Sequence, residues 1–124
     1  MNELANPLEL CGFEFIEFVA KDKELDEIFK TIGFSKVAKH KSKNVYLWRQ
    51  GNINIILNYQ PESAAAYFFK EHGPSACAMG FRTKDAAKAF NKAIELGAEP
   101  IYSKIGPMEL NIPAIKGIGG SPIY

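Results

Sequence analysis

The sequence predicts a single α+β domain built from two β-α-β-β-β modules. Two observations lead to this fold class. Segments rich in aromatic and β-branched residues, which favour strands, alternate with short segments whose apolar residues recur at helical spacing. The order of these segments then starts again about 63 residues later. A chain of 124 residues, 47% of them hydrophobic, matches one ordinary core.

The first module begins with a strand over 12–19 and continues with a helix. Asp22 is expected to cap the start of this helix, and Gly33 supplies its left-handed stop. The apolar residues that define its buried face are Leu25, Ile28, Phe29 and Ile32. Three strands follow, over 34–39, 44–49 and 53–59, with turn residues at 50–52 between the last two. The first module therefore spans about 12–59.

A connecting helix over 62–72 leads to the second module, which begins with a strand over 76–82. Thr83 is expected to cap the next helix, and the residues that share its apolar face are Ala86, Phe90, Ala93 and Gly97. FRTKD at 81–85 repeats FVAKD at 18–22, and the helix-ending glycines lie 64 residues apart. The second module spans about 76–124. Its last strand is expected to start near Ser121 and to be truncated, which indicates one piece of a longer polypeptide.

Composition excludes several classes of protein. A formal net charge of +1 offers no broad positive field for a nucleic acid. The amino terminus has no secretory pattern, and no segment approaches the roughly 20 apolar residues that span a bilayer. Cys11 and Cys77 are too few for a disulfide framework, and we expect both to be small buried hydrophobes. The sequence therefore predicts a soluble cytoplasmic protein that binds neither nucleic acid nor membrane.

The chain offers few candidates for a metal site. A non-haem iron site needs two histidines and a carboxylate, and only two histidines are present. His40 is surrounded by lysines at a strand end or hairpin, which repels cations. His72 falls in the last turn of a helix, where an imidazole commonly bonds terminal carbonyls. We therefore predict no catalytic, cofactor-binding or metal-ligating residue in this chain.

Other candidate residues have structural interpretations. Glu14 and Glu17 lie on opposite faces of the first strand, so they cannot form a carboxylate pair, and the one that points inward is expected to be partly exposed or paired with a lysine. The lysines of 36–43 suit a solvated hairpin tip. The glycines of 116–120 precede a strand rather than a helix, so we expect a turn or bulge there. The aromatic residues that could line a pocket, or simply form core, are Phe13, Phe15, Phe18, Tyr46, Trp48, Tyr59, Tyr67, Phe68 and Phe69.

Paired β-α-β-β-β units resemble the vicinal-oxygen-chelate superfamily, which includes the glyoxalase and bleomycin-resistance proteins. Three stretches indicate a particular family within this superfamily: HGPSACAMGFRTKDA at 72–86, LWRQGNINIILN at 47–58 and IPAIKGIGGSPIY at 112–124. With GFEFIEFV at 12–19, they resemble the amino-terminal half of bacterial 4-hydroxyphenylpyruvate dioxygenases over nearly the whole chain. The resemblance implies an open, mixed-sheet barrel with helices outside.

The resemblance also implies a parent enzyme of tyrosine catabolism that converts 4-hydroxyphenylpyruvate and O₂ to homogentisate and CO₂. Its Fe(II) site belongs to a carboxyl-terminal catalytic domain, which would be this chain's partner in a homo-oligomer, and some relatives carry haemolysin or pigment labels. The corresponding strand positions here hold Glu14 and Ala78, so no iron ligand can be carried over. Two alternatives stay open: a free-standing small-molecule-binding module of the glyoxalase and bleomycin-resistance type, and the amino-terminal half of a hydroxymandelate synthase.

Overall fold

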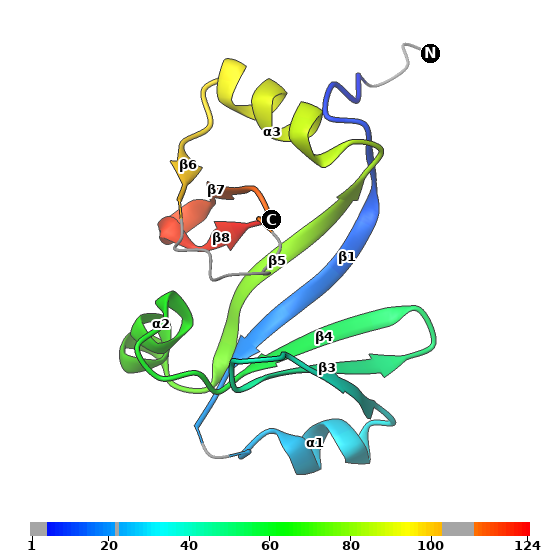
Figure 1. Ribbon diagram of the computed structural model, residues 1–124, viewed down its shortest axis with the longest axis vertical. Coiled ribbons are helices and arrows are strands. Elements are labelled where there is room, and N and C mark those ends of the chain that lie inside the picture. Colours follow the sequence, from blue (N-terminus) through cyan, green and yellow to red (C-terminus); the bar gives the residue numbers. More distant parts are fainter. Residues whose placement is uncertain (1–4, 22, 103–110) are drawn as a thin grey trace. The chain divides into compact units, whose positions relative to one another are not determined.

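The computed structural model describes residues 5–21, 23–102 and 111–124. In this part of the chain, eight strands form one mixed, open sheet in the order β2-β3-β4-β1-β5-β8-β7-β6. The strands are β1 (Leu10–Val19), β2 (Ser35–Lys39), β3 (Val45–Gln50), β4 (Ile53–Asn58), β5 (Ser75–Thr83), β6 (Pro100–Ile101), β7 (Ala114–Lys116) and β8 (Pro122–Ile123). The helices are α1 (Asp26–Thr31), α2 (Ala64–His72) and α3 (Ala86–Glu95) (Figure 1). The predicted α+β class is confirmed.

The chain divides into two compact units. One comprises Glu14–Met79, and the other comprises 1–13 together with Gly80–Tyr124. The long strands β1 and β5 contribute residues to both units. No α-helix of the described residues is long and apolar enough to cross a membrane.

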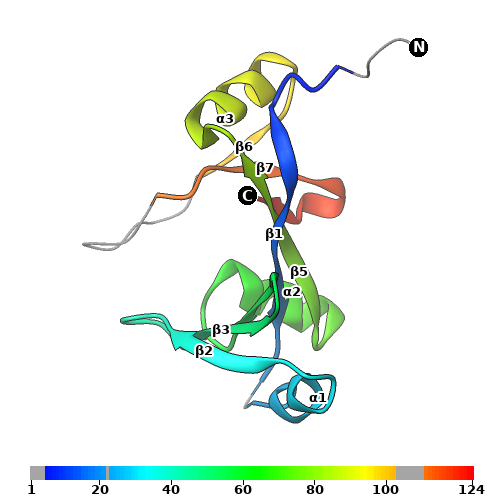
Figure 2. The ribbon, with the colours of Figure 1, turned by 90° about the vertical axis from the view of Figure 1, so that its right-hand side faces the viewer.

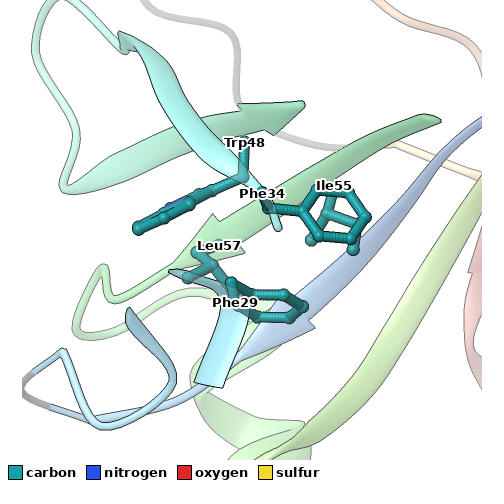
Figure 3. Close-up of a cluster of buried hydrophobic side chains, with 5 residues drawn as sticks. All are labelled: Phe29, Phe34, Trp48, Ile55 and Leu57. Carbon is teal, nitrogen blue, oxygen red and sulfur yellow. The ribbon is translucent and has the colours of Figure 1, made fainter. Parts of the chain in front are cut away.

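In the unit Glu14–Met79, the main apolar core packs against the hairpin-connected strands β2, β3 and β4, which are called the hairpin sheet below. Strands β2, β3 and β4 pair antiparallel, and β4 pairs parallel with β1, so that Phe18 lies opposite Leu57. Helix α1 lies beside β2 and β3 and supplies a buried phenylalanine (Figure 2). The buried side chains of this core are Phe29, Phe34, Trp48, Ile55 and Leu57 (Figure 3). Trp48 and Leu57 are completely buried, so they form the centre of the cluster.

The first helix differs from its prediction at its start and on part of its face. It begins at Asp26 after an uncapped Leu25, whereas the predicted cap, Asp22, lies outside the described residues. Phe29 and Leu25 pack in or against the core as expected. Ile28 and Ile32 are each 54% exposed, because a helix of six residues turns only a narrow stripe toward the sheet.

The second unit contains α3 and the short strands β6, β7 and β8. Helix α3 contacts β7 and buries Ala89 and Ala93, while the predicted face residue Ala86 is exposed. Its cap is Asp85, whose carboxylate accepts a hydrogen bond from the Lys88 amide, so the prediction of Thr83 was wrong. Ala86 is the first residue of α3, whereas Ala89 and Ala93 lie within the helix.

The glycine segment after β7 forms the predicted turn. A short 3₁₀ turn covers Ile118–Gly120, and β8 follows it. Gly119 and Gly120 both have positive φ, at 72° and 82°, which favours glycine at these positions. The turn closes with a hydrogen bond from the Gly120 amide to the Gly117 carbonyl. No phosphate loop is formed, because strand and not helix follows the glycines.

Candidate functional site

A polar cluster of Glu17, Asn58 and Cys77 joins three strands of the unit Glu14–Met79. The side-chain amide of Asn58 donates to Oε2 of Glu17 at 3.1 Å. The thiol of Cys77 donates to the same oxygen at 3.6 Å and lies equally close to the Glu17 carbonyl. Cys77 is only 3% exposed. The residues are 41 and 60 positions from Glu17 in sequence, so only the folded sheet brings them together.

Strand alternation places Glu17 on the face of β1 opposite to the core that α1 covers. Glu17 lies opposite Ile56 on β4, whereas the next pair, Phe18 and Leu57, points to the core that α1 covers. Asn58 is two residues beyond Ile56 and therefore shares the Glu17 face. Of the two glutamates of β1, Glu17 is therefore the one that meets Asn58 and Cys77.

Glu17 is partly exposed, which is one of the two outcomes that the sequence favoured. Its hydrogen-bond donors are an amide and a thiol. The amide of Asn58 is itself oriented, because its Oδ1 accepts a hydrogen bond from the Gln60 backbone at 2.9 Å. The alternative of a lysine partner is not the one observed, and nothing in the sequence indicated Asn58, at the end of β4, as a partner of Glu17.

Burial dominates the electrostatics of this cluster. It raises the pKa of Glu17 above its ordinary value, and the hydrogen bonds from Asn58 and Cys77 oppose the rise. Burial also raises the pKa of the Cys77 thiol, and the nearby Glu17 carboxylate raises it further. A protonated thiol is a poor nucleophile, so the arrangement suits hydrogen bonding rather than covalent catalysis.

The carboxylate of Asp26, at the start of α1, is buried and is held by two partners. Its Oδ1 accepts a hydrogen bond from the Tyr59 hydroxyl, and its Oδ2 pairs with the Lys36 ammonium at 3.1 Å. The pKa of Tyr59 is raised by burial and by its hydrogen bond to Asp26. Lys36 also lies over the rings of Tyr46 and Trp48, at 4.5 and 5.4 Å from their centroids. Lys36 is therefore a structural residue, which corrects the view that all lysines of 36–43 form a solvated tip.

Both histidines have local structural partners. Nδ1 of His40 accepts hydrogen bonds from the backbone amides of Ser42 and Lys43, each at 3.2 Å, so it organises the turn after β2. The His72 ring packs against Phe68, with the centroids 4.3 Å apart. The carbonyl of Phe69 at that helix end accepts from the Gly73 amide instead.

The described residues do not fit an iron ion. Within 5–21, 23–102 and 111–124, no group of three His, Cys, Asp or Glu side chains is placed to hold a metal. The polar cluster offers one carboxylate, one buried thiol and a neutral amide, and the two His rings serve elsewhere.

The two cysteines have opposite environments. Cys77 is buried, as predicted, whereas Cys11 is exposed, so the expectation that both are buried was wrong for Cys11. Cys11 lies at the start of β1, where the burial pattern is exposed over four residues, and its thiol donates to the Glu9 carbonyl at 3.4 Å. The apolar residues around Cys11 in sequence therefore do not indicate its exposure.

Comparison with known proteins gives one consistent result for the family. The model of the hydroxyphenylpyruvate dioxygenase (HPPD) N-terminal domain matches residues 4–124. A 4-hydroxyphenylpyruvate dioxygenase of Pseudomonas sp. (strain P.J. 874) is 59% identical over 120 residues, which are 96% of this chain and 34% of that protein. Hemolysin VllY of Vibrio vulnificus (strain CMCP6) is 51% identical over 100% of this chain and 36% of its own length. The chain spans about a third of these relatives.

Solved structures agree on the fold. A fusion protein of a xylose isomerase-like TIM barrel and a 4-hydroxyphenylpyruvate dioxygenase matches with a TM-score of 0.82 and 40% identity, over 93% of this chain and 19% of that one. A mutant 4-hydroxymandelate synthase from Streptomyces coelicolor matches with a TM-score of 0.74 over 92% of this chain and 36% of that one. At 18% identity, this second likeness shows the fold alone.

Proposed function

Because the chain belongs to the family of hydroxyphenylpyruvate dioxygenase N-terminal domains, we propose that it acts as the non-catalytic N-terminal domain of an Fe(II)-dependent 4-hydroxyphenylpyruvate dioxygenase. The parent enzyme would convert 4-hydroxyphenylpyruvate and O₂ to homogentisate and CO₂ in the breakdown of tyrosine in the cytoplasm. The observation that carries the non-catalytic role is the donor set: among the described residues, the polar side chains that face one another cannot hold iron.

This chain spans about a third of the length of its relatives. In this proposal, the iron site and the carboxyl-terminal catalytic domain lie in the remaining part of the parent polypeptide. The chain's own contribution is structural. It supplies a folded sheet whose two β-α-β-β-β modules, about 12–59 and 76–124 with the helix of 62–72 between them, dock the catalytic domain and support a homo-oligomer. The relative named Hemolysin VllY agrees with a haemolysin-related label, but lytic activity is no part of this proposal.

A domain-exchange experiment tests the proposal. The matching region of the Pseudomonas sp. enzyme, 59% identical, is replaced by this chain, and turnover of 4-hydroxyphenylpyruvate is measured with bound iron determined in parallel. We expect kcat/KM within about tenfold of the parent enzyme, or about 1.4 kcal/mol in transition-state free energy, because no catalytic donor is exchanged. The control enzyme with the region deleted should lose turnover.

A chimera that folds and binds iron but has lost turnover by several orders of magnitude would argue against the proposal. The alternative interpretation, a free-standing small-molecule-binding module, predicts a different result. It requires this chain alone to dimerise and to bind a small molecule, which equilibrium dialysis of the isolated chain measures. A hydroxymandelate synthase would be recognised by its product, hydroxymandelate, when the complete natural polypeptide turns over 4-hydroxyphenylpyruvate.

A further inference from the structure

The turn between β7 and β8 presents one apolar side chain to solvent. Its sequence is GIGG over 117–120, so Ile118 carries the only side chain of the turn (Figure 1). Ile118 is 101% exposed, whereas tight turns usually carry glycine, proline, asparagine, aspartate or serine. A β-branched apolar side chain at such a position gains nothing from burial unless a partner covers it. Ile118 is therefore a candidate contact residue.

Glycines on both sides of Ile118 hold the turn in one shape. The two glycines that follow it have left-handed backbone, which suits glycine better than any other residue. Gly117 lies so close to β8 that a Cβ there would come within 2.9 Å of Cδ1 of Ile123 and 3.0 Å of the Ser121 carbonyl oxygen. The Gly117 amide also donates to that carbonyl at 2.8 Å. Ile118 is thus preorganised, so a contact through it would cost little backbone entropy.

The end of β8 fixes the point from which the parent polypeptide continues. The relatives are longer proteins, and the region that this chain matches is the N-terminal domain of the family. The catalytic domain of the proposed parent enzyme therefore follows residue 124. The Tyr124 carbonyl accepts a hydrogen bond from the Phe81 amide at 2.8 Å, which ties this exit point to β5. Because Ile123 lies against Gly117, the polypeptide leaves the domain beside the turn that carries Ile118.

We propose that Ile118 is an anchor through which this domain docks onto the catalytic domain of the same polypeptide, by filling an apolar pocket on that domain's surface. This inference rests on the proposed function, because it takes the catalytic domain as the occupant. The position of the exit point favours this occupant over a second copy of the chain, since a domain tethered beside the turn is present there at high effective concentration. One aliphatic side chain on a rigid element is the kind of group that anchors an interface.

Thiol labelling tests the contact. Ile118→Cys is made in a Cys11→Ser background, because Cys11 is the exposed natural thiol and Cys77 is buried. Mass spectrometry follows the reaction of position 118 with a water-soluble maleimide, in the 124-residue chain and in the chimera with the remainder of the Pseudomonas sp. enzyme. We expect the folded chimera to react about tenfold or more slowly than the folded chain, because a covered thiol reacts only when the contact opens. Both should react equally fast in urea. Equal rates in the two folded proteins would overturn the proposal.

A second measurement keeps the isoleucine. The δ1 methyl signal of Ile118 is recorded by NMR with a gadolinium chelate, which broadens methyl groups that solvent reaches. In the isolated chain the Ile118 methyl should be broadened and the methyls of the buried Leu57 should stay sharp. In the chimera both should be sharp. An Ile118 methyl that stays broadened in the chimera would overturn the proposal, as would protection that appears in the isolated chain as its concentration rises, since a second copy would then be the occupant.

These outcomes are separate from those of the domain exchange. An active chimera in which Ile118 stays accessible would contradict the contact and leave the proposed function standing. A folded, iron-loaded chimera without turnover would argue against the proposed function, whatever the labelling rates.

Discussion

Replacing Leu57 with alanine should lower the free energy of unfolding by about 2–5 kcal/mol, the usual range for a buried leucine. Leu57 is completely buried in the cluster with Phe29, Phe34, Trp48 and Ile55. The truncation removes apolar contacts and leaves a cavity that α1 and the hairpin sheet can fill only partly. Urea denaturation followed by Trp48 fluorescence measures the change, since the indole lies in the same cluster.

The same strand offers the matched control. Ile53 begins β4, four residues before Leu57, and is 58% exposed. Ile53→Ala removes a side chain of equal size from a position that water already reaches, so the cost should stay within about 0.5 kcal/mol. Equal losses for the two variants would show that the apolar centre of this unit lies elsewhere.

Asp26→Ala should cost about 1.5–3 kcal/mol, the range for hydrogen bonds to a charged group. The substitution removes the acceptor of the Tyr59 hydroxyl and the partner of Lys36 in one step. The Asp26 side chain is 8% exposed, so solvent screens these interactions weakly, although Lys36 at 35% can recover some hydration. Thermal or urea unfolding of the wild type and the variant at neutral pH measures this loss in the free energy of unfolding.

Glu27 is the neighbouring control for this second variant. It also pairs with a lysine, Lys30 at 3.2 Å, but its side chain is 84% exposed. An exposed pair contributes about 0–1 kcal/mol, so Glu27→Ala should be nearly silent. Two variants with equal, small losses would mean that the buried position of Asp26 adds nothing to its ion pair.

Strong periodic signals made much of the fold predictable. The aromatic and β-branched segments at 12–19, 44–49 and 53–59 correspond closely to β1, β3 and β4, and Gly33 follows α1 with the positive φ of 98° that its role as a stop requires. Helix starts were less predictable. Asp85 and Thr83 are both good capping residues, and only the path of the chain after β5 decides between them.

The polar cluster could be predicted only in part. Alternation shows that Glu14 and Glu17 face opposite ways, but not which one is covered. The partners Asn58 and Cys77 depend on the register of β4 and on the approach of β5, which are long-range properties of the fold. Lys36 could not be predicted for the same reason. Its neighbours in sequence indicate a solvated run of lysines, whereas its ion-pair partner, Asp26, lies ten positions earlier in the chain. Cys11 has apolar neighbours in sequence, yet it is exposed at the start of β1.

The most direct test of the central claim is calorimetric titration of the purified chain with Fe(II) in the absence of oxygen. If the iron donors lie outside this chain, the titration should show no stoichiometric binding, and the same sample should not turn over 4-hydroxyphenylpyruvate. One tightly bound equivalent of Fe(II), with a Kd of about 1 µM or below, would contradict the assignment of this chain as a non-catalytic domain.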